Sequence, residues 1–224
     1  MRICHISDTH GNFNTLFGKF DIIVHSGDFL PNSKAIFGKN RIENEINFQK
    51  SWLSNNINVL KKFIGNHPFI FINGNHDFID PDYIEEFLKE NGVNAINATN
   101  KMINYNDFKF YGFPYIPYIK NFWNYEKTVQ EMKKEIELLS DYFNNNHIDI
   151  LISHCPPYKI LDKANSNENI GNSSLSDAIN YIINKENLPT HILCGHCHES
   201  FGIKYQLDIL FSNAATTHNL IEIF

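Results

Sequence analysis

Short apolar, β-rich segments alternate with helical patterns along this chain of 224 residues, and no other feature constrains the fold as strongly. The alternation is typical of an α/β layered architecture. The segments that predict strands are 2–7, 22–26, 69–73, 101–105, 109–112, 148–153, 191–194 and 209–212. A last segment, 220–224, is expected to close a sheet edge.

Four stretches carry apolar residues at the three- and four-residue spacing of an amphipathic helix. Asp80 and Pro81 form a start signal, a capping side chain followed by proline at the first helical position. Ser174 and Asp177 have the spacing of a capping box. Helices are expected over 42–64, 81–91, 129–143 and 174–183. Because no repeat or long linker separates them, residues 1–224 are expected to form a single domain.

Composition narrows the class of protein. The net charge of -6 disfavours a broad electrostatic grip on nucleic acid. The first residues lack the features of a signal peptide, and no run approaches the roughly 18 apolar residues of a membrane span. Four cysteines are too few for a disulfide scaffold. We therefore expect a cytoplasmic protein.

Polar residues gather directly behind five of the predicted strands. In open α/β sheets ligands bind outside the carboxyl ends of the strands, so these clusters are expected to meet at one site. Turn chemistry could explain one such cluster, but it does not explain five in succession. The clusters are Asp8-Thr9-His10, Gly27-Asp28, Gly74-Asn75-His76-Asp77, Ser153-His154 and Gly195-His196-Cys197-His198.

These side chains have the chemistry of a metal centre. Carboxylate and amide oxygens combined with imidazole nitrogens favour Mn, Fe or Zn over Ca or Mg. Seven donors exceed one tetrahedral site, and a bridging carboxylate would give each of two metals four ligands. Sites with two metals ~3.5–4 Å apart serve in-line displacement at phosphorus. His76, adjacent to Asn75, should point elsewhere and could protonate a leaving alkoxide.

The order of these residues resembles the calcineurin-like metallophosphoesterase superfamily, whose pattern is D-x-H, G-D, G-N-H-[DE], H and G-H-x-H. Every element of the pattern is present here. The resemblance implies a four-layer α/β/β/α sandwich with two mixed β-sheets, formed by one domain over residues 1–224. The chain is most similar to the small single-domain metallophosphoesterase-domain-containing type, whose better-known members act on phosphodiesters.

The resemblance also implies roles for the matching residues. Asp28 would bridge two divalent metals and belong to the catalytic set, and His76 would be the acid near the leaving group. Asp77 would support the loop rather than bind metal. The other ligands would be Asp8, His10 and His198 for the first metal, and Asn75, His154 and His196 for the second.

Three further residues concern the surroundings of the site. His25 lies within a strand just before Asp28 and is expected to support the metal ligands. Phe113 and Tyr115 belong to an aromatic segment. That segment either packs as an ordinary loop or forms a wall against which a nucleoside base stacks.

The sequence thus predicts a binuclear metal-dependent phosphoric ester hydrolase, using Mn²⁺, Fe or Zn, in which a metal-bridging hydroxide attacks phosphorus in line. The arginine with which protein Ser/Thr phosphatases clamp phosphate is absent after Asp28. A diester needs less charge neutralisation than a monoester, so a phosphodiesterase is favoured, with cyclic nucleotides as candidate substrates.

Several alternatives stay open. Within enzymes they are a phosphomonoesterase and a dinucleotide-polyphosphate hydrolase. Outside enzymes, the alternative is a nucleotide-binding module with little turnover. In each case the expected partner is a small phosphoester or nucleotide, with no role for a membrane or for nucleic acid.

Overall fold

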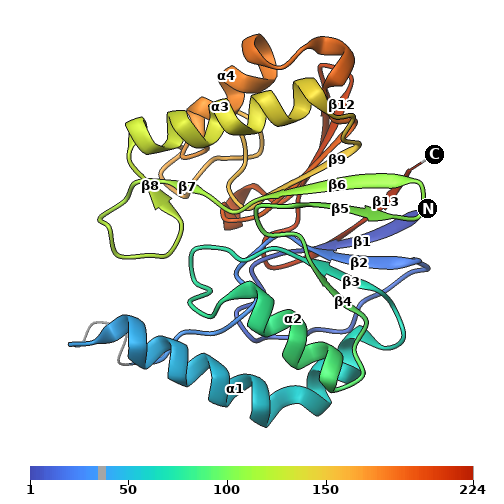
Figure 1. The fold of residues 1–224 in the computed structure, drawn as a ribbon, viewed down its shortest axis with the longest axis vertical. Helices are drawn as coiled ribbons and strands as arrows, with labels where there is room; N and C mark the ends of the chain where they lie inside the picture. Colours follow the sequence, from blue (N-terminus) through green and yellow to red (C-terminus); the bar gives the residue numbers. More distant parts are fainter. Residues whose placement is uncertain (35–38, 224) are drawn as a thin grey trace.

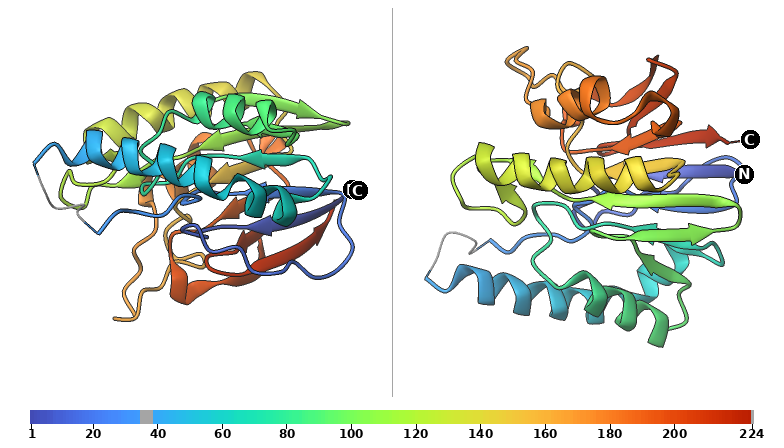
Figure 2. Two further views of the ribbon diagram at one scale, coloured as in Figure 1. Left: turned by 90° about the horizontal axis from the view of Figure 1, so that it is seen from below. Right: turned by 45° about the horizontal axis from the view of Figure 1, so that its top comes forward.

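The structure is a computed structural model that describes residues 1–34 and 39–223. Two large mixed β-sheets lie face to face, and helices cover the outer face of each (Figure 1). The predicted four-layer α/β/β/α arrangement is therefore confirmed. Figure 2 shows the same fold from two further directions.

The helices and strands follow one another in the order that the alternating pattern predicts. They are β1 (Arg2–Ile6), β2 (Ile22–His25), α1 (Arg41–Ile64), β3 (Phe69–Phe71), α2 (Pro81–Glu90), β4 (Ala95–Asn97), β5 (Met102–Tyr105), β6 (Phe108–Phe113), β7 (Ile116–Pro117), β8 (Glu126–Lys127), α3 (Val129–Asn145), β9 (Ile150–Ser153), α4 (Ser173–Asp177), β10 (His191–Cys194), β11 (Gly202–Gln206), β12 (Ile209–Asn213) and β13 (His218–Glu222).

Each sheet has a parallel centre. The first has the order β13-β1-β2-β3-β4, with β1 to β4 parallel and β13 antiparallel to β1. The second has the order β11-β12-β10-β9-β6-β5, with antiparallel pairs only at its two edges. The carboxyl ends of the parallel strands in both sheets therefore lead into loops on the same side of the sandwich.

Apolar side chains fill the three spaces between the four layers. Phe69 of β3 packs with Leu53 of α1 on the helix side of the first sheet. The next residue, Ile70, faces the opposite way and packs with Ile150 of β9 between the sheets. Leu151 in turn faces α3 and α4. This two-residue alternation explains why the strands read as continuous apolar runs, because both of their faces are buried.

The described residues contain four strands that the sequence did not predict, and one predicted strand is shifted. The four are β4, β11 and the two-residue strands β7 and β8. The last strand, expected over 220–224, runs from His218 to Glu222, and Phe224 lies outside the described residues.

The fourth helix is also different from its prediction. Asn172, and not Ser174, caps α4, because its side-chain oxygen accepts the N–H of Leu175 at 3.0 Å. Beyond Asp177 the chain continues as a π-helical turn over Ala178–Ile182. The start signal at Asp80 and Pro81 is confirmed, since the Asp80 carboxylate accepts the N–H of Asp82 at 2.8 Å. In residues 1–34 and 39–223, no helix is both long and apolar enough to cross a membrane.

Candidate metal centre

The five polar clusters lie on loops at the carboxyl ends of β1, β2, β3, β9 and β10. Backbone hydrogen bonds hold these loops together. The N–H of Asp8 donates to Gly27 at 2.9 Å, and the N–H of His10 donates to Asp28 at 3.0 Å. In the second sheet, the N–H of Gly195 donates to His154 at 2.9 Å. The two sheets thus present their polar loops to one another.

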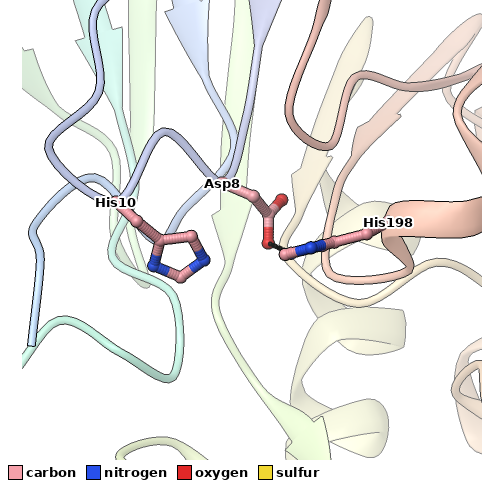
Figure 3. A group of neighbouring side chains, drawn as sticks. All are labelled: Asp8, His10 and His198. Carbon is pink, nitrogen blue, oxygen red and sulfur yellow. Dashed lines mark hydrogen bonds and ion pairs between the residues drawn. The ribbon is translucent and has the colours of Figure 1, made fainter.

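Among the described residues, three overlapping groups of side chains have potential ligand atoms within 4.8 Å of one another. The first contains Asp8, His10 and His198, which come from opposite ends of the sequence (Figure 3). In it, Asp8 Oδ1 lies 3.2 Å from His198 Nε2. The second group joins His10 and Asp28 to His76. The third joins Asp8 and Asp28 to His154.

Asp28 occupies the centre of the site. Its Oδ2 lies 3.4 Å from His154 Nε2 and 3.8 Å from His10 Nε2. Its Oδ1 accepts the backbone N–H of His76 at 2.7 Å. One carboxylate oxygen thus faces a histidine from each of the two expected ligand sets, which is the position a bridging ligand needs.

The ring orientation of His154 directs its Nε2 into the site. Its Nδ1 is 2.9 Å from the carbonyl oxygen of Ser26 and donates to it. Its Nε2 faces Asn75 Oδ1 at 2.9 Å and Asp28 Oδ2 at 3.4 Å. The Asp28 charge favours a proton on this ring, and a bound metal ion would take the place of that proton. The arrangement therefore fits a metal ion bound by His154, Asn75 and Asp28.

Buried negative charge points to the same conclusion. Asp8 and Asp28 are each only 2% exposed. In the part of the chain that the structure describes, their ion-pair partners are histidines rather than lysine or arginine. Burying two carboxylates without a cation is costly. Divalent metals bound by oxygen and imidazole would compensate that cost.

The electrostatics of these groups are strongly coupled. Burial acts to raise the pKa of Asp28, but the nearby His154 and His76 outweigh it and hold that pKa well below its usual range. Burial also acts to raise the pKa of Asp8, but the hydrogen bond with His198 helps to outweigh it, and that pKa is lowered. For His154, burial is outweighed by the Asp28 charge, which raises the pKa to about 9. Both carboxylates are therefore ionised near neutral pH and available as ligands.

His196 is held at the site mainly through its backbone. Its N–H donates to Asp8 Oδ2 at 2.8 Å, and its ring centre lies 5.1 Å from that of His154. The ring does not belong to any of the three groups above, within the residues described. Burial lowers the pKa of His196 to about 4, so the ring is neutral and able to act as a ligand at neutral pH.

The backbone is strained at four of the expected ligands. Asp8, His10, Asp28 and His196 have φ angles of 52°, 44°, 58° and 63°. This left-handed region is sparsely populated by residues with a side chain and costs of order 1–3 kcal/mol for each. Such strain persists where the surrounding structure imposes it, and it typically marks functional sites.

Two glycines allow the loops to approach closely. A Cβ at Gly195 would collide with the Ser7 hydroxyl and the Asp8 carboxylate. A Cβ at Gly74 would collide with Asp28 and, at 2.7 Å, with the His154 ring. The glycines of Gly-Asn-His-Asp and Gly-His-x-His are therefore required by space rather than by turn geometry alone.

His76 is fixed at its Nδ1 edge by Asn32. The Asn32 amide nitrogen donates to Glu45 at 3.2 Å and to the His76 carbonyl at 3.1 Å, so its oxygen faces the ring. That oxygen accepts from Nδ1, which leaves Nε2 as the free ring nitrogen. Burial is the main cause that lowers the pKa of His76, and the Asp28 charge opposes it.

Asp77 ties the second and third clusters together. Its carboxylate accepts the N–H groups of Leu30 and Gly74 at 2.8 Å and of Phe29 at 3.2 Å. Burial and the neighbouring Asp28 charge raise the pKa of Asp77 to about 7, against the effect of these three donors. Its carboxylate is turned toward the backbone of both loops, where it holds Asp28 beside the residues that follow Gly74.

The geometry can now be set beside known proteins. A sequence model of the calcineurin-like phosphoesterase family matches residues 1–200. The chain belongs to this family. The matched range includes every cluster described above, from Asp8 to His198.

No curated protein matches this calcineurin-like phosphoesterase. Among solved structures, one described as a novel archaeal phosphodiesterase is similar at 13% identity, with a TM-score of 0.38. That similarity covers 95% of this chain and 82% of the other. A likeness this low carries no argument about substrate.

His25 contacts the two loops that carry Asp8 and Asp28. It is fully buried, its Nδ1 accepts the N–H of Gly27 at 3.2 Å, and its Nε2 lies 3.0 Å from the Thr9 hydroxyl. These contacts reach the residues immediately beside Asp8 and Asp28. That His25 supports bound metal ligands stays a prediction.

Of the two alternatives for the aromatic segment, the packing of Phe113 and Tyr115 favours an ordinary packed loop over a substrate wall. Phe113 is 1% exposed and packs in the core under α3, so it offers no surface to a substrate. Tyr115 packs beside it, and its hydroxyl accepts from the Asn100 amide at 3.0 Å. The aromatic side chain of this segment that does reach the site is Trp123, whose ring centre is 3.9 Å from that of His76.

Sequence reasoning missed several polar residues that hold the site. Gln49 of α1 is fully buried, donates to the His76 carbonyl at 2.7 Å and accepts the Phe78 N–H at 2.8 Å. Glu45, one turn earlier, binds the Asn32 amide. A signal for Gln49 was available, because it occupies a core position between the apolar residues of the helix. Asn32 carried no such signal.

Proposed function

We propose that this protein is a metal-dependent phosphodiesterase with a two-metal centre. The observation that carries the proposal is the position of Asp28, whose Oδ2 faces His10 on one side and His154 on the other. The first metal would be held by Asp8, His10, Asp28 and His198, and the second by Asp28, Asn75, His154 and His196. Bound divalent ions such as Mn²⁺, Fe or Zn would supply charge neutralisation and an activated water.

The protein's own residues would orient the ester and handle its proton. Asn32 holds Nδ1 of His76, so Nε2 is the nitrogen from which a protonated ring could donate to a leaving oxygen. One of its ring nitrogens lies within 4.8 Å of potential ligand atoms of His10 and Asp28, which is close enough for His76 to act beside the proposed ligands. General acid catalysis of this kind typically contributes ~10²–10⁴-fold.

The cationic side chains favour a diester over a monoester. The chain has only two arginines, and neither clamps the site: Arg2 pairs with Asp21 at 3.0 Å, and Arg41 stacks on Phe122. A phosphomonoester dianion would lack the bidentate partner that arginine provides. A diester has one negative charge and therefore needs less positive charge from the site to neutralise it. Cyclic nucleotides are candidate substrates on this ground.

The proposal is tested with metal-stripped protein titrated with Mn²⁺. Hydrolysis of bis(p-nitrophenyl) phosphate is compared with that of p-nitrophenyl phosphate. Asn75→Ala should lower the number of bound metals from two to one and abolish turnover. His76→Ala should keep both metals but lose activity, and it should lose more on a diester with an alkyl leaving group than on one with nitrophenolate, because the weaker acid needs protonation more.

His147→Ala serves as the control, since that side chain is exposed and pairs with Asp149 away from the site. Preference for the monoester would make the protein a phosphatase. Protein that binds two metals but hydrolyses neither ester would contradict an enzymatic function and favour a nucleotide-binding role.

A further inference from the structure

The loop between β7 and β8 folds around a single carboxylate. Glu126 Oε2 accepts the N–H groups of Ile119, Lys120 and Asn121 at 2.8, 2.9 and 2.8 Å. Its Oε1 accepts those of Phe122 and Trp123 at 2.9 and 2.7 Å. Five consecutive backbone donors converge on one side chain. They outweigh its partial burial and lower the pKa of Glu126, so the carboxylate is ionised at neutral pH.

The same loop is fastened to the backbone of the proposed metal-binding segment. The N–H of Asn124 donates to the Asn75 carbonyl at 3.0 Å, and the Asn124 amide nitrogen donates to the Asp77 carbonyl at 2.8 Å. Both acceptors flank His76 in the sequence. We call residues 119–125 the Glu126 loop. A shift of this loop would therefore also displace the segment that carries His76.

The Glu126 loop places the Trp123 side chain beside His76. Its ring lies over the His76 imidazole with 3.9 Å between ring centres and an angle of 35° between the planes. The His10 ring approaches His76 edge-on at 4.8 Å, and Asn32 occupies the Nδ1 edge. The imidazole is thus bounded on three sides. A rotation of the imidazole would meet Trp123 or break the Asn32 contact.

We propose that Trp123 and Glu126 are positioning residues that fix the His76 ring for reaction. This inference rests on the proposed function, in which His76 is the acid. Glu126 acts indirectly. It orders the backbone of the Glu126 loop, and that loop holds Trp123 against the imidazole. Neither side chain is placed on the substrate or on a metal.

The energetic reason is orientation. An acid contributes fully only when its donor atom is held near the leaving oxygen, and a displacement of about 1 Å can cost ~10²-fold in rate. A histidine on a loop has two side-chain torsions to restrict. Stacking against an indole restricts them more firmly than solvent would, since the aromatic contact favours one ring plane.

The test compares Trp123→Ala, Trp123→Phe and Glu126→Gln in Mn²⁺-loaded protein, with an alkyl-leaving-group phosphodiester. Trp123→Ala should lower kcat about 10- to 100-fold with little change in KM or in the number of bound metals. Trp123→Phe should recover most of that loss, because a ring still covers the imidazole. Glu126→Gln should lower kcat in the same direction, since an amide presents one acceptor oxygen where the carboxylate presents two.

Matched controls are Tyr181→Ala, which removes a ring that is 84% exposed, and Glu137→Gln on the exposed side of α3. Both should keep wild-type kcat. A second readout does not depend on activity: the ring signals of His76 in ¹³C-histidine-labelled protein, assigned by their absence in His76→Gln. They should shift in Trp123→Ala and in Glu126→Gln, because the ring current of the indole is removed or displaced.

Two results would overturn the inference. One is wild-type kcat in both Trp123→Ala and Glu126→Gln; the other is an unchanged His76 signal in those variants. Failure of the proposed function looks different, because the unmodified protein would then bind metal without hydrolysing any ester. In that case the His76 signals would still decide whether the Glu126 loop positions the ring.

Discussion

Replacing His5 should make the protein less sensitive to acid. His5 lies in β1 and is fully buried between the two sheets. Its Nδ1 is 2.8 Å from the Ser212 hydroxyl of the second sheet, and its Nε2 is 2.9 Å from the Ser26 hydroxyl of the first. Burial is the main cause that lowers the pKa of His5 to about 3, and neighbouring His25 adds to it.

The direction in which pH changes the stability follows from how many protons the folded and unfolded states bind. The unfolded chain takes up a proton below the ordinary pKa of 6.5, whereas the folded protein excludes it down to about pH 3. Since the unfolded state binds more protons in this window, stability is complete above pH 6.5 and falls as the pH decreases toward 3. Between pH 8 and pH 5 this single group should remove about 2 kcal/mol from the free energy of unfolding.

The assay is urea unfolding of metal-stripped protein at pH 8 and pH 5, for wild type and His5→Gln. At pH 8 the variant should be less stable by ~1–3 kcal/mol, because it loses hydrogen bonds to the two serines. At pH 5 that deficit should shrink by about 2 kcal/mol, since glutamine takes up no proton. His147→Gln is the exposed control. If the wild-type and His5→Gln stabilities change in parallel with pH, the buried neutral histidine is not the cause.

Three other substitutions or treatments have defined outcomes. Asp77→Ala leaves three backbone N–H groups without their acceptor and should lower metal affinity ~10–100-fold, measured by calorimetric titration with Mn²⁺ against Asp107→Ala on an exposed turn. Gly195→Ala should abolish binding of at least one metal, because its Cβ would displace the Asp8 carboxylate; atomic absorption of the purified protein reads this directly. Removing metals should lower the melting temperature, and returning them at about 100 times Kd should restore ~2.7 kcal/mol. A melting temperature that does not respond to metal would contradict the charge argument for Asp8 and Asp28.

Five of the strands that the sequence predicted, β1, β2, β3, β9 and β10, are buried on both faces, so they read as apolar runs. Two of the strands that it missed lack a comparable signal. β4 has the sequence AIN, in which Ala and Asn do not favour strands, and it forms because it pairs with β3. β11 was missed because its hairpin turn, Leu207-Asp208, has positive φ at both residues without the usual Asn-Gly signature.

The residues of the candidate site also fall into two groups, those that the sequence predicted and those that it missed. Short motifs behind predicted strands reveal which residues meet, because strand ends in parallel sheets converge. They do not reveal what fixes those residues. Asn32 and Trp123 reach His76 from segments 44 and 47 positions away, and the contacts depend on how loops fold over the sheet ends. Phe113 shows the converse: it resembled a wall residue in sequence, yet β6 directs it into the core.

The charge balance of the proposed site leads to a last prediction, the preference for diesters. Two divalent ions set against Asp8 and Asp28 leave two positive charges, because the other five proposed ligands are neutral. A hydroxide nucleophile and a diester anion would cancel them, whereas a monoester dianion would leave one negative charge uncompensated in a site without an arginine clamp. The values of kcat/KM for a monoester and a diester with the same leaving group measure this difference. A higher value for the diester agrees with the balance, and a higher value for the monoester would mean that a cation outside this ligand set binds the phosphate.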